Sequence, residues 1–394
     1  MVQERGQAPR DPKFSWAFAV ICSEPVPGFE PCRISPGPKT DQPLEYVDML
    51  SVLQQTPDQL TAWFAERSQP AYRAGQVRRW LFERRADAFE RMTDLPLALR
   101  DQLAAEFRLW TTQVATLRRS DDGSEKLLLS LADGERIECV LLRDDRQHCT
   151  ACISSQVGCG MGCAFCATGI DGVVRNLAAG EIVEQLLRLQ QVLGPDERLS
   201  HVVVMGMGEP LANLDHVLQA LALATAPDAL GISARRVTIS TVGLPAGIRR
   251  LADLNCQYHL AVSLHAADDA LRDRLVTANR KIGIAAVLGA ADEYFEKTGR
   301  RVTYEYVLLA DVNDRVDDAR RLVGLLRGRP ALINLIPYNP VAGLPYRTPS
   351  AGSTARFVDT LSQGGLNAVV RHRKGNRIDA ACGQLRRWGR DSRQ

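Results

Sequence analysis

The sequence predicts an α/β protein built on a partial (β/α)6 barrel, preceded by a small N-terminal helical domain and a disordered N-terminal extension. Two observations carry this prediction. After residue 166, apolar strand-like segments alternate with amphipathic helical segments, and five of the ten cysteines gather between residues 149 and 166. Such alternation is typical of a parallel sheet with helical crossovers. Clustered cysteines indicate metal or redox chemistry on that scaffold.

The composition of the 394-residue chain is that of a folded protein without a membrane span. Hydrophobic residues make up 45% and charged residues 24%, which excludes a mostly disordered, collagen-like or coiled-coil chain. No run of 18 apolar residues occurs, so no membrane helix is expected. The short apolar stretch at 14–22 continues into Glu24-Pro25 instead of a signal cleavage site. We therefore expect a cytoplasmic protein with no membrane partner.

Four segments are expected along the chain. Residues 1–48 hold eight of the twenty prolines without periodicity and predict a disordered extension, or a start codon misplaced ahead of Met49. Residues 49–112 predict a helical domain and residues 113–150 a strand-rich connector. Residues 151–394 predict the barrel with a basic C-terminal segment. The helices expected in the second segment begin at Pro57 and span 71–85 and 95–109, and the connector strands span 126–131 and 136–142.

The barrel strands are expected where short apolar runs follow helical stretches. These runs span 151–155, 201–205, 236–240, 259–264, 302–308 and 332–336. Helices are expected between them over 179–193, 214–223, 284–297 and 316–326. In such folds the chemistry collects at the carboxyl ends of the strands.

The charge is concentrated at the C-terminal end. Residues 371–394 contain eight Lys or Arg and two Asp, a formal charge of +6, whereas the whole chain carries only +3. A basic end on a nearly neutral body is typical of a protein that binds a polyanion. A solvated, frayed tail is the alternative interpretation.

The motif CxxxCxxC at Cys159, Cys163 and Cys166 is the strongest chemical signal. Three thiolates in one loop can bind three irons of a 4Fe–4S cluster and leave the fourth iron open to a small molecule. Glycines at 158, 160 and 162 let the backbone fold tightly around such a group. A zinc knuckle is the alternative, although His148 and Cys149 are poorly spaced to complete it.

This loop after the first strand of a βα barrel resembles the radical S-adenosylmethionine (SAM) superfamily. The sequence Gly206-Met207-Gly208-Glu209-Pro210 follows the second strand and looks like the superfamily's element that holds the amino group of SAM. The resemblance implies one 4Fe–4S cluster whose open iron binds SAM. One electron then splits SAM to a 5′-deoxyadenosyl radical.

A narrower resemblance is to the RlmN/Cfr family of RNA adenosine methyltransferases. It covers about residues 49–388 and includes 152–159, Arg175-Asn176-Leu177, 263–266, 334–340 and 379–385. The resemblance implies SAM contacts from a set of residues at the strand ends. These are Gly208, Glu209, Ser240, Ser263, Leu264, His265 and Asn339. Taken alone, the serines would cap turns and His265 would be a structural histidine.

The same resemblance assigns a two-cysteine mechanism that consumes two SAM molecules per turnover. Cys382 carries the methyl group as S-methylcysteine, and Cys152 resolves the protein–RNA crosslink through a transient disulfide with Cys382. Glu138 is the implied proton acceptor, although the residues around Cys139 and 147–149 depart from the family pattern. Taken alone, Cys152 would be a buried strand cysteine. The basic residues around Cys382 are expected to favour its thiolate.

The expected reaction is methylation of C2 of an adenosine in 23S rRNA, with tRNA as a further substrate and a flavodoxin or ferredoxin as electron donor. C8 methylation is the nearest alternative, and a zinc-stapled RNA-binding module without catalysis is an alternative of another class. The target base must leave its stack to meet Cys382. Arginines of the helical domain are expected to bind phosphates, at 73, 78, 79, 84, 85 and 91.

Overall fold

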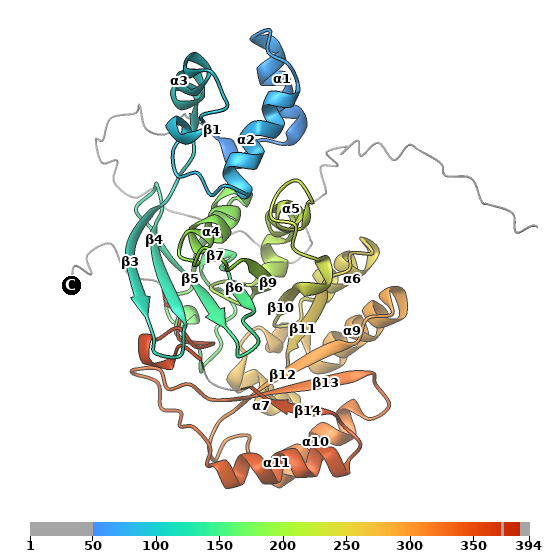
Figure 1. The fold of residues 1–394 in the computed structure, drawn as a ribbon. Helices are drawn as coiled ribbons and strands as arrows, with labels where there is room; N and C mark the ends of the chain where they lie inside the picture. Colours follow the sequence, from blue (N-terminus) through green and yellow to red (C-terminus); the bar gives the residue numbers. More distant parts are fainter. Residues whose placement is uncertain (1–49, 372–373, 387–394) are drawn as a thin grey trace, which may run out of the picture. The chain divides into compact units, whose positions relative to one another are not determined.

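The computed structural model describes residues 50–371 and 374–386, so the extension expected at 1–48 lies outside the described residues. Its centre is a mixed sheet of ten strands in the order β14-β13-β12-β11-β10-β9-β6-β5-β4-β3 (Figure 1). Neighbouring strands are parallel from β6 to β14. These parallel strands are β6 (Cys149–Cys152), β9 (Leu199–Val204), β10 (Val237–Thr241), β11 (His259–Ser263), β12 (Val302–Leu308), β13 (Ala331–Pro337) and β14 (Ala368–Val370). The predicted α/β class is confirmed.

Helices connect the parallel strands and cover one face of the sheet (Figure 1). They are α4 (Ala179–Gln191), α5 (Leu214–Thr225), α6 (Pro245–Asp253), α9 (Ile284–Thr298), α10 (Val316–Leu326) and α11 (Ala351–Gln363). Each is amphipathic, and its apolar residues join one core with the strands, as Ile182, Val183 and Leu186 of α4 do. Among the described helices, none is long and apolar enough to cross a membrane.

Three antiparallel strands extend the barrel sheet beyond β6. They are β3 (Gln113–Arg119), β4 (Glu125–Ser130) and β5 (Arg136–Arg143). β5 pairs with β6, so the connector strands and the barrel share one sheet. Before them lie α1 (Pro57–Glu66), α2 (Tyr72–Phe82) and α3 (Leu97–Glu106), flanked by the paired strands β1 (Leu50–Ser51) and β2 (Phe107–Arg108).

The first barrel strand differs from its predicted span of 151–155. β6 begins at Cys149 and ends at Cys152 because the chain then turns away from the sheet. The Ser154 amide donates to the side chain of Gln185, and the Ser155 amide donates to the Met207 carbonyl, so neither continues the strand pairing. After this early exit the chain forms the short strand β7 (Gln156–Gly158), which leads directly into the cysteine motif.

Candidate active site

The three motif cysteines lie on the loop between β7 (Gln156–Gly158) and β8 (Val173–Asn176), an antiparallel pair that follows β6. Cys159, Cys163 and Cys166 all line one cavity of about 120 Å³, here called the cluster cavity. In the part of the chain that the structure describes, no three His, Cys, Asp or Glu side chains lie close enough together to hold one metal ion. The three cysteines thus share the wall of one cavity.

The backbone and the burial of this loop suit a bound cationic group. Gly158 has φ +76°, and a Cβ there would lie 2.1 Å from the Gly172 carbonyl oxygen, so only glycine fits. Burial raises the pKa of the Cys159 thiol to about 12 and also raises that of Cys163. Thiolates in this cavity therefore need a bound cation to offset the cost of their charge.

The second part of the cluster cavity is the turn that follows β9. Gly208 has φ +104°, and a Cβ there would lie 2.6 Å from the Gln156 side chain. The Glu209 carboxylate is buried and accepts hydrogen bonds from the amides of Leu211 (3.0 Å) and Val242 (2.8 Å). Burial raises the pKa of Glu209, which those hydrogen bonds oppose. The turn thus presents one positioned carboxyl group to the cavity.

A carboxylate from β12 joins the two serines of the predicted SAM site. Ser240 Oγ donates to Glu305 Oε2 at 2.7 Å, and Ser263 Oγ lies 3.4 Å from the same oxygen. Sheet register produces this group, because Ser263 on β11 pairs with Glu305 on β12. Because the Ser240 hydroxyl donates its proton to the hydrogen bond with Glu305, its oxygen lone pairs can still accept a hydrogen bond from a donor in the cavity.

His265 lines the cluster cavity, but one ring nitrogen already has a structural role. Its Nδ1 accepts a hydrogen bond from the Val307 amide at 3.1 Å, and the residue has φ +60°. Burial lowers the pKa of His265 to about 3, with Arg272 adding to the effect, so the imidazole is neutral. Leu264 is fully buried and lines neither of the cavities described here. Its amide donates to the Glu305 carbonyl.

A buried guanidinium stands behind this wall. Arg272 lies in α7 (Asp269–Leu275) and donates to the carbonyls of Val242, Ser263 and Leu264, which follow or end β10 and β11. Burial lowers its pKa to about 10, and the nearby Cys163 opposes that shift. One side chain therefore ties two strand ends to the helix beneath the cysteine loop.

Asn339 supplies the observation that best tests the cofactors implied by the resemblance. Its Nδ2 donates to the Cys382 carbonyl at 3.2 Å. Its Oδ1 is buried and has no hydrogen-bond partner among the described residues, although it belongs to the wall of the cluster cavity. A buried orphan acceptor points to a missing donor. Three cysteines, a close-approach glycine and this acceptor together fit a 4Fe–4S cluster with SAM.

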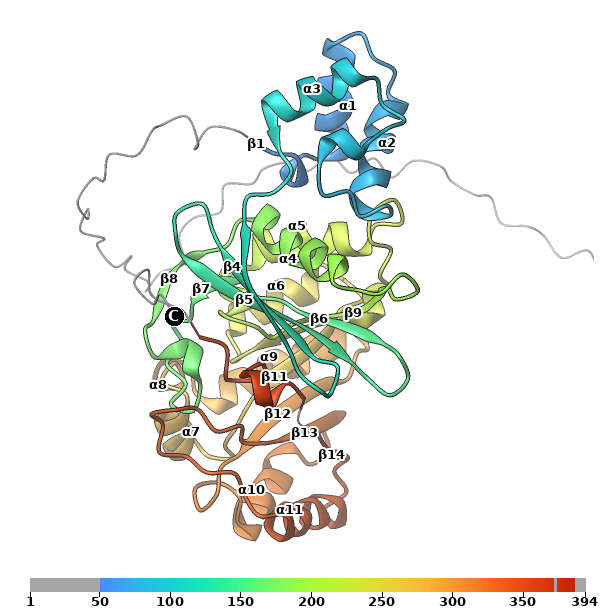
Figure 2. The ribbon, with the colours of Figure 1, turned by 60° about the vertical axis from the view of Figure 1, so that its left-hand side comes forward.

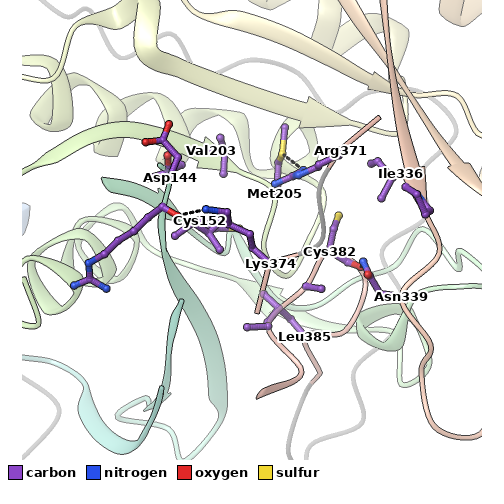
Figure 3. Close-up of a pocket in the computed structure, with 16 residues that line it drawn as sticks. Asp144, Cys152, Val203, Met205, Ile336, Asn339, Arg371, Lys374, Cys382 and Leu385 are labelled. Carbon is purple, nitrogen blue, oxygen red and sulfur yellow. Dashed lines mark hydrogen bonds between the residues drawn. The ribbon is translucent and has the colours of Figure 1, made fainter. Parts of the chain in front are cut away.

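A second cavity, of about 340 Å³, adjoins the first and is here called the cysteine-pair cavity. Cys152, at the end of β6, and Cys382, from the C-terminal segment (residues 379–386), both line it (Figure 3). Cys382 also lines the cluster cavity, as do Met205 and Asn339. Cys382 therefore lies where the two cavities meet.

Both thiols of the pair are protonated at neutral pH. Desolvation raises the pKa of Cys152 to about 11, and it also raises that of Cys382. The positive charge of Arg371 opposes both shifts without overcoming them. Cys382 itself is exposed through the cavity. Arg371 thus favours the Cys382 thiolate in the direction expected of a basic neighbour, but desolvation is the larger effect and favours the neutral thiol.

Glu138 lies apart from both cavities. It sits on β5, buried, with its Oε1 2.8 Å from Lys126 Nζ and its Oε2 accepting from the Arg386 amide at 3.0 Å. The carboxylate is thus beneath the C-terminal segment rather than in the wall of the cysteine-pair cavity.

Most arginines of the helical domain serve the protein's own structure. Arg78 is buried and pairs with Asp228, and Arg85 donates to the Glu197 carbonyl, so both fasten the domain to the barrel. The remaining contacts are local: Arg73 with the Asp94 carbonyl, Arg84 with Asp94 and Arg91 with Asp87. Arg79 is exposed. At the other end, Arg371 and Lys374 line the cysteine-pair cavity, whereas residues 387–394 lie outside the described residues.

The structure gathers nearly all predicted site residues around two adjoining cavities; Leu264 and Glu138 are the exceptions. Sequence reasoning missed Glu305, Lys126 and Arg272. A signal existed for Glu305, since it is the one charged residue within the apolar strand Val302–Leu308. For Lys126, it is the structure that shows a buried position on β4. Arg272 gave no signal, because α7 carries charged residues on every side.

Comparison with known proteins agrees with this geometry. A family model described as the radical SAM superfamily matches residues 153–323, and one described as the ribosomal RNA large subunit methyltransferase N-terminal domain matches residues 50–109. A probable dual-specificity RNA methyltransferase RlmN from Rhodopirellula baltica is 59% identical over 330 residues, covering 84% of this chain and 89% of the relative.

Two further matches extend over the same region. A probable dual-specificity RNA methyltransferase RlmN from Moorella thermoacetica is 46% identical over 346 residues, covering 86% of this chain and 97% of the relative. The crystal structure of a radical SAM methyltransferase from Sphaerobacter thermophilus superposes with a TM-score of 0.83 at 40% identity. It covers 85% of this chain and 99% of that chain.

Proposed function

We propose, from the premise that this chain belongs to the RlmN family of radical SAM RNA methyltransferases, that it methylates C2 of an adenosine in 23S rRNA and also acts on tRNA. One observation carries the mechanism. Cys382 lines both the cavity of the motif cysteines and the cavity of Cys152. A single sulfur at that junction can receive a methyl group on one side and meet a nucleic-acid base on the other.

Cofactor binding falls to the wall of the cluster cavity. Cys159, Cys163 and Cys166 would hold the 4Fe–4S cluster, and the residues implied by the resemblance would hold SAM. When bound, this pair supplies an electrophilic methyl group and, after one-electron cleavage, a carbon radical that removes hydrogen. The electron would come from a flavodoxin or ferredoxin in the cytoplasm. The orphan Oδ1 of Asn339 supports a SAM donor at this wall.

Cys382 would act as the methyl carrier. Its sulfur takes a methyl group by displacement, and loss of one hydrogen from that S-methyl group yields a carbon that bonds to the adenine ring. The thiol must lose its proton first, because burial raises its pKa. Arg371, which lowers that pKa, lines the same cavity and would favour ionisation.

Cys152 would release the product by attacking the Cys382 sulfur, which frees the methylated base and leaves a disulfide. The two residues share the cysteine-pair cavity, and this supports the pairing. Glu138 is proposed as the proton acceptor for the ring hydrogen. Its carboxylate accepts a hydrogen bond from the Arg386 amide, and Arg386 follows Cys382 by four residues. Glu138 therefore contacts the same segment that contains Cys382.

RNA would enter from the cysteine-pair cavity. Arg371 and Lys374 line it and offer positive charge to a phosphate. The target base must be unstacked to enter, and a base already in a loop is unstacked at the least cost.

Mass spectrometry of digested RNA tests the position of the methyl group. Anaerobically reconstituted protein, a reductant, SAM and large-subunit rRNA should give 2-methyladenosine, compared with standards of the C2 and C8 isomers. Iron, sulfide and zinc assays on the same sample separate the cluster enzyme from a zinc-stapled binding module. A C8 product would replace the proposed position, and a zinc protein without SAM cleavage would replace the reaction itself.

Replacement of Cys152 tests the two-cysteine mechanism. Cys152→Ala should trap Cys382 covalently on RNA, because the crosslink forms and no thiol is placed to release it. Protein purified from cells should then carry extra mass that nuclease removes, and adding Cys382→Ala should abolish it. An adduct that survives the double replacement would refute the mechanism. Normal turnover of the single variant would show that another residue resolves the crosslink, and Cys149 would be the first candidate to test.

A further inference from the structure

A buried ion pair joins two neighbouring strands of the connector. Lys126 Nζ on β4 lies 2.8 Å from Glu138 Oε1 on β5, and their side chains are only 3% and 2% exposed. Removing two charges from water is costly, and their mutual attraction alone seldom offsets that cost. A pair of this kind therefore calls for further partners that use the remaining hydrogen-bonding capacity of both groups.

Those further partners lie in the C-terminal segment. Lys126 Nζ donates to the Asp379 carbonyl at 2.9 Å, and Glu138 Oε2 accepts from the Arg386 amide at 3.0 Å. The two contacts stand at the two ends of the segment, and Cys382 lies between them. Figure 2 shows this part of the chain, in red, beside β3–β5.

The segment has no regular structure of its own to hold it in place. None of its residues 379–386 belongs to a helix or strand. Asp379 and Gly383 both have left-handed backbone, with φ +51° and +84°, and for a residue other than glycine that conformation costs free energy. External contacts must therefore keep the segment in this shape.

Further contacts of the segment come from the turn after β13 and from the motif loop. Asn339 Nδ2 donates to the Cys382 carbonyl at 3.2 Å, and Gln384 Nε2 donates to the Pro340 carbonyl at 2.9 Å. The Ala167 amide donates to the Gly383 carbonyl at 2.8 Å, and Thr168 Oγ1 donates to the Leu385 carbonyl at 2.5 Å. Both donors directly follow the last motif cysteine. The segment is thus held by the ion pair, the motif loop and the turn after β13, with Cys382 at the junction of the two cavities.

We propose that the Lys126–Glu138 pair is a clamp that docks the C-terminal segment and so positions the Cys382 sulfur. Lys126 is a positioning residue that touches neither cavity, and Glu138 acts in the clamp as a hydrogen-bond acceptor and counter-charge. An apolar pair would fill the same space but would offer nothing to Asp379 or Arg386. The consequence for methyl transfer rests on the proposed function, whereas the docking itself does not.

The clamp is tested by removing both charges together. Lys126→Met combined with Glu138→Leu leaves no unpaired buried charge, and such replacements are often neutral for stability. In protein without cofactors, hydrogen exchange of residues 379–386 and iodoacetamide alkylation of Cys382 should each become roughly tenfold faster or more, because two charged-group hydrogen bonds are lost. Alkylation of Cys256 should stay unchanged.

A matched control removes another ion pair. Arg329→Met with Asp292→Leu removes a partly buried pair at the amino-terminal end of β13, away from the segment. Its exchange and Cys382 alkylation should match the wild type. If the Lys126 and Glu138 double variant is folded and shows wild-type exchange in the segment, the clamp is refuted.

Two measurements keep the test decisive if that variant does not fold. In the wild type, the Arg386 amide should exchange slowly, and rapid exchange there overturns the clamp. Glu138→Gln keeps an oxygen that can accept from Arg386 and Lys126, so the segment should stay docked and Cys382 alkylation should stay near the wild-type rate. Loss of methylated RNA by that variant with a docked segment would assign proton transfer to Glu138. An undocked segment in Glu138→Gln would show that the clamp requires the charge.

These readouts separate the clamp from the reaction. Exchange and alkylation need no cluster, SAM or RNA, so they report the clamp even if the enzyme acts at C8 or by another route. Conversely, an enzyme that never methylates Cys382 while its segment stays protected would refute the proposed mechanism and leave the clamp intact.

Discussion

The wall of the cluster cavity and the C-terminal segment meet at Cys382 but are built by different means. On the wall, sheet register places Ser263 opposite Glu305 and Glu305 opposite Asn334, so each side chain inherits its position from a strand. The C-terminal segment has no such ladder. It is held by single hydrogen bonds to Lys126, Glu138, the motif loop and the turn after β13.

This difference predicts different responses to mutation. Strands in the core open only when the whole domain unfolds, whereas an irregular segment with a few contacts can open locally. Mutations in the wall of the cluster cavity should therefore destabilise the whole domain rather than disorder the wall locally. The segment that contains Cys382 should lose its geometry locally while the rest of the protein stays folded.

The largest effect is expected at the loop that both regions share. Cys159→Ala, Cys163→Ala or Cys166→Ala should abolish methylation, because the cluster needs all three thiolates. Iron and sulfide per chain, measured after anaerobic reconstitution, should fall well below the wild-type content. A variant that retained its iron and still cleaved SAM reductively would remove these cysteines from the cofactor site.

The next effect tests global failure of the wall. Arg272→Met should lower the free energy of unfolding by about 3 kcal/mol or more, because the carbonyls of Val242, Ser263 and Leu264 lose a buried donor. Urea denaturation measures this change. Exchange in the C-terminal segment should rise no more than exchange in the core. A loss below about 1 kcal/mol would contradict the role given to the guanidinium.

A smaller effect is expected at the turn after β9. Gly208→Ala combines φ +104° with a Cβ 2.6 Å from Gln156, and should cost about 2–3 kcal/mol in thermal or urea unfolding. Gly343→Ala is the matched control: its φ is +85°, yet no atom lies within 4 Å of the added Cβ. It should cost only about 1 kcal/mol. Equal losses would show that the close approach to Gln156 is unimportant.

The smallest effect concerns the segment's thiol. Because the pKa of Cys382 is raised, the neutral thiol prevails at pH 7, and alkylation should keep accelerating as the pH rises past the range where an ordinary cysteine levels off. Arg371→Gln removes the charge that lowers this pKa and should slow alkylation a few-fold at pH 8. A free thiol compound is the reference. A plateau below pH 8 would indicate a thiolate in the resting enzyme.

Sequence pattern was a good guide wherever a side chain's position follows from a strand. The barrel strand predicted at 302–308 has those bounds in the structure, and all the residues implied at the strand ends except Leu264 line the same cavity. Periodicity suffices there, because an apolar run bounded by turns leaves few other ways to bury itself.

Pattern failed where a position depends on partners far along the chain. Lys126 and Glu138 look like solvated residues of an alternating hairpin, but in the structure both are buried and bond to the C-terminal segment, more than 240 residues later. The arginines of the helical domain were expected to bind phosphates, yet Arg78 and Arg85 bond to residues of the barrel instead. Charge alone does not distinguish an internal tie from an external binding site.

The hydrogen bonds from Ala167 and Thr168 tie the residues directly after the last motif cysteine to the C-terminal segment. A shift of the motif loop would therefore pull on the Gly383 and Leu385 carbonyls, which lie one and three residues after Cys382. Whatever group the loop binds thus has a mechanical connection to the position of that cysteine.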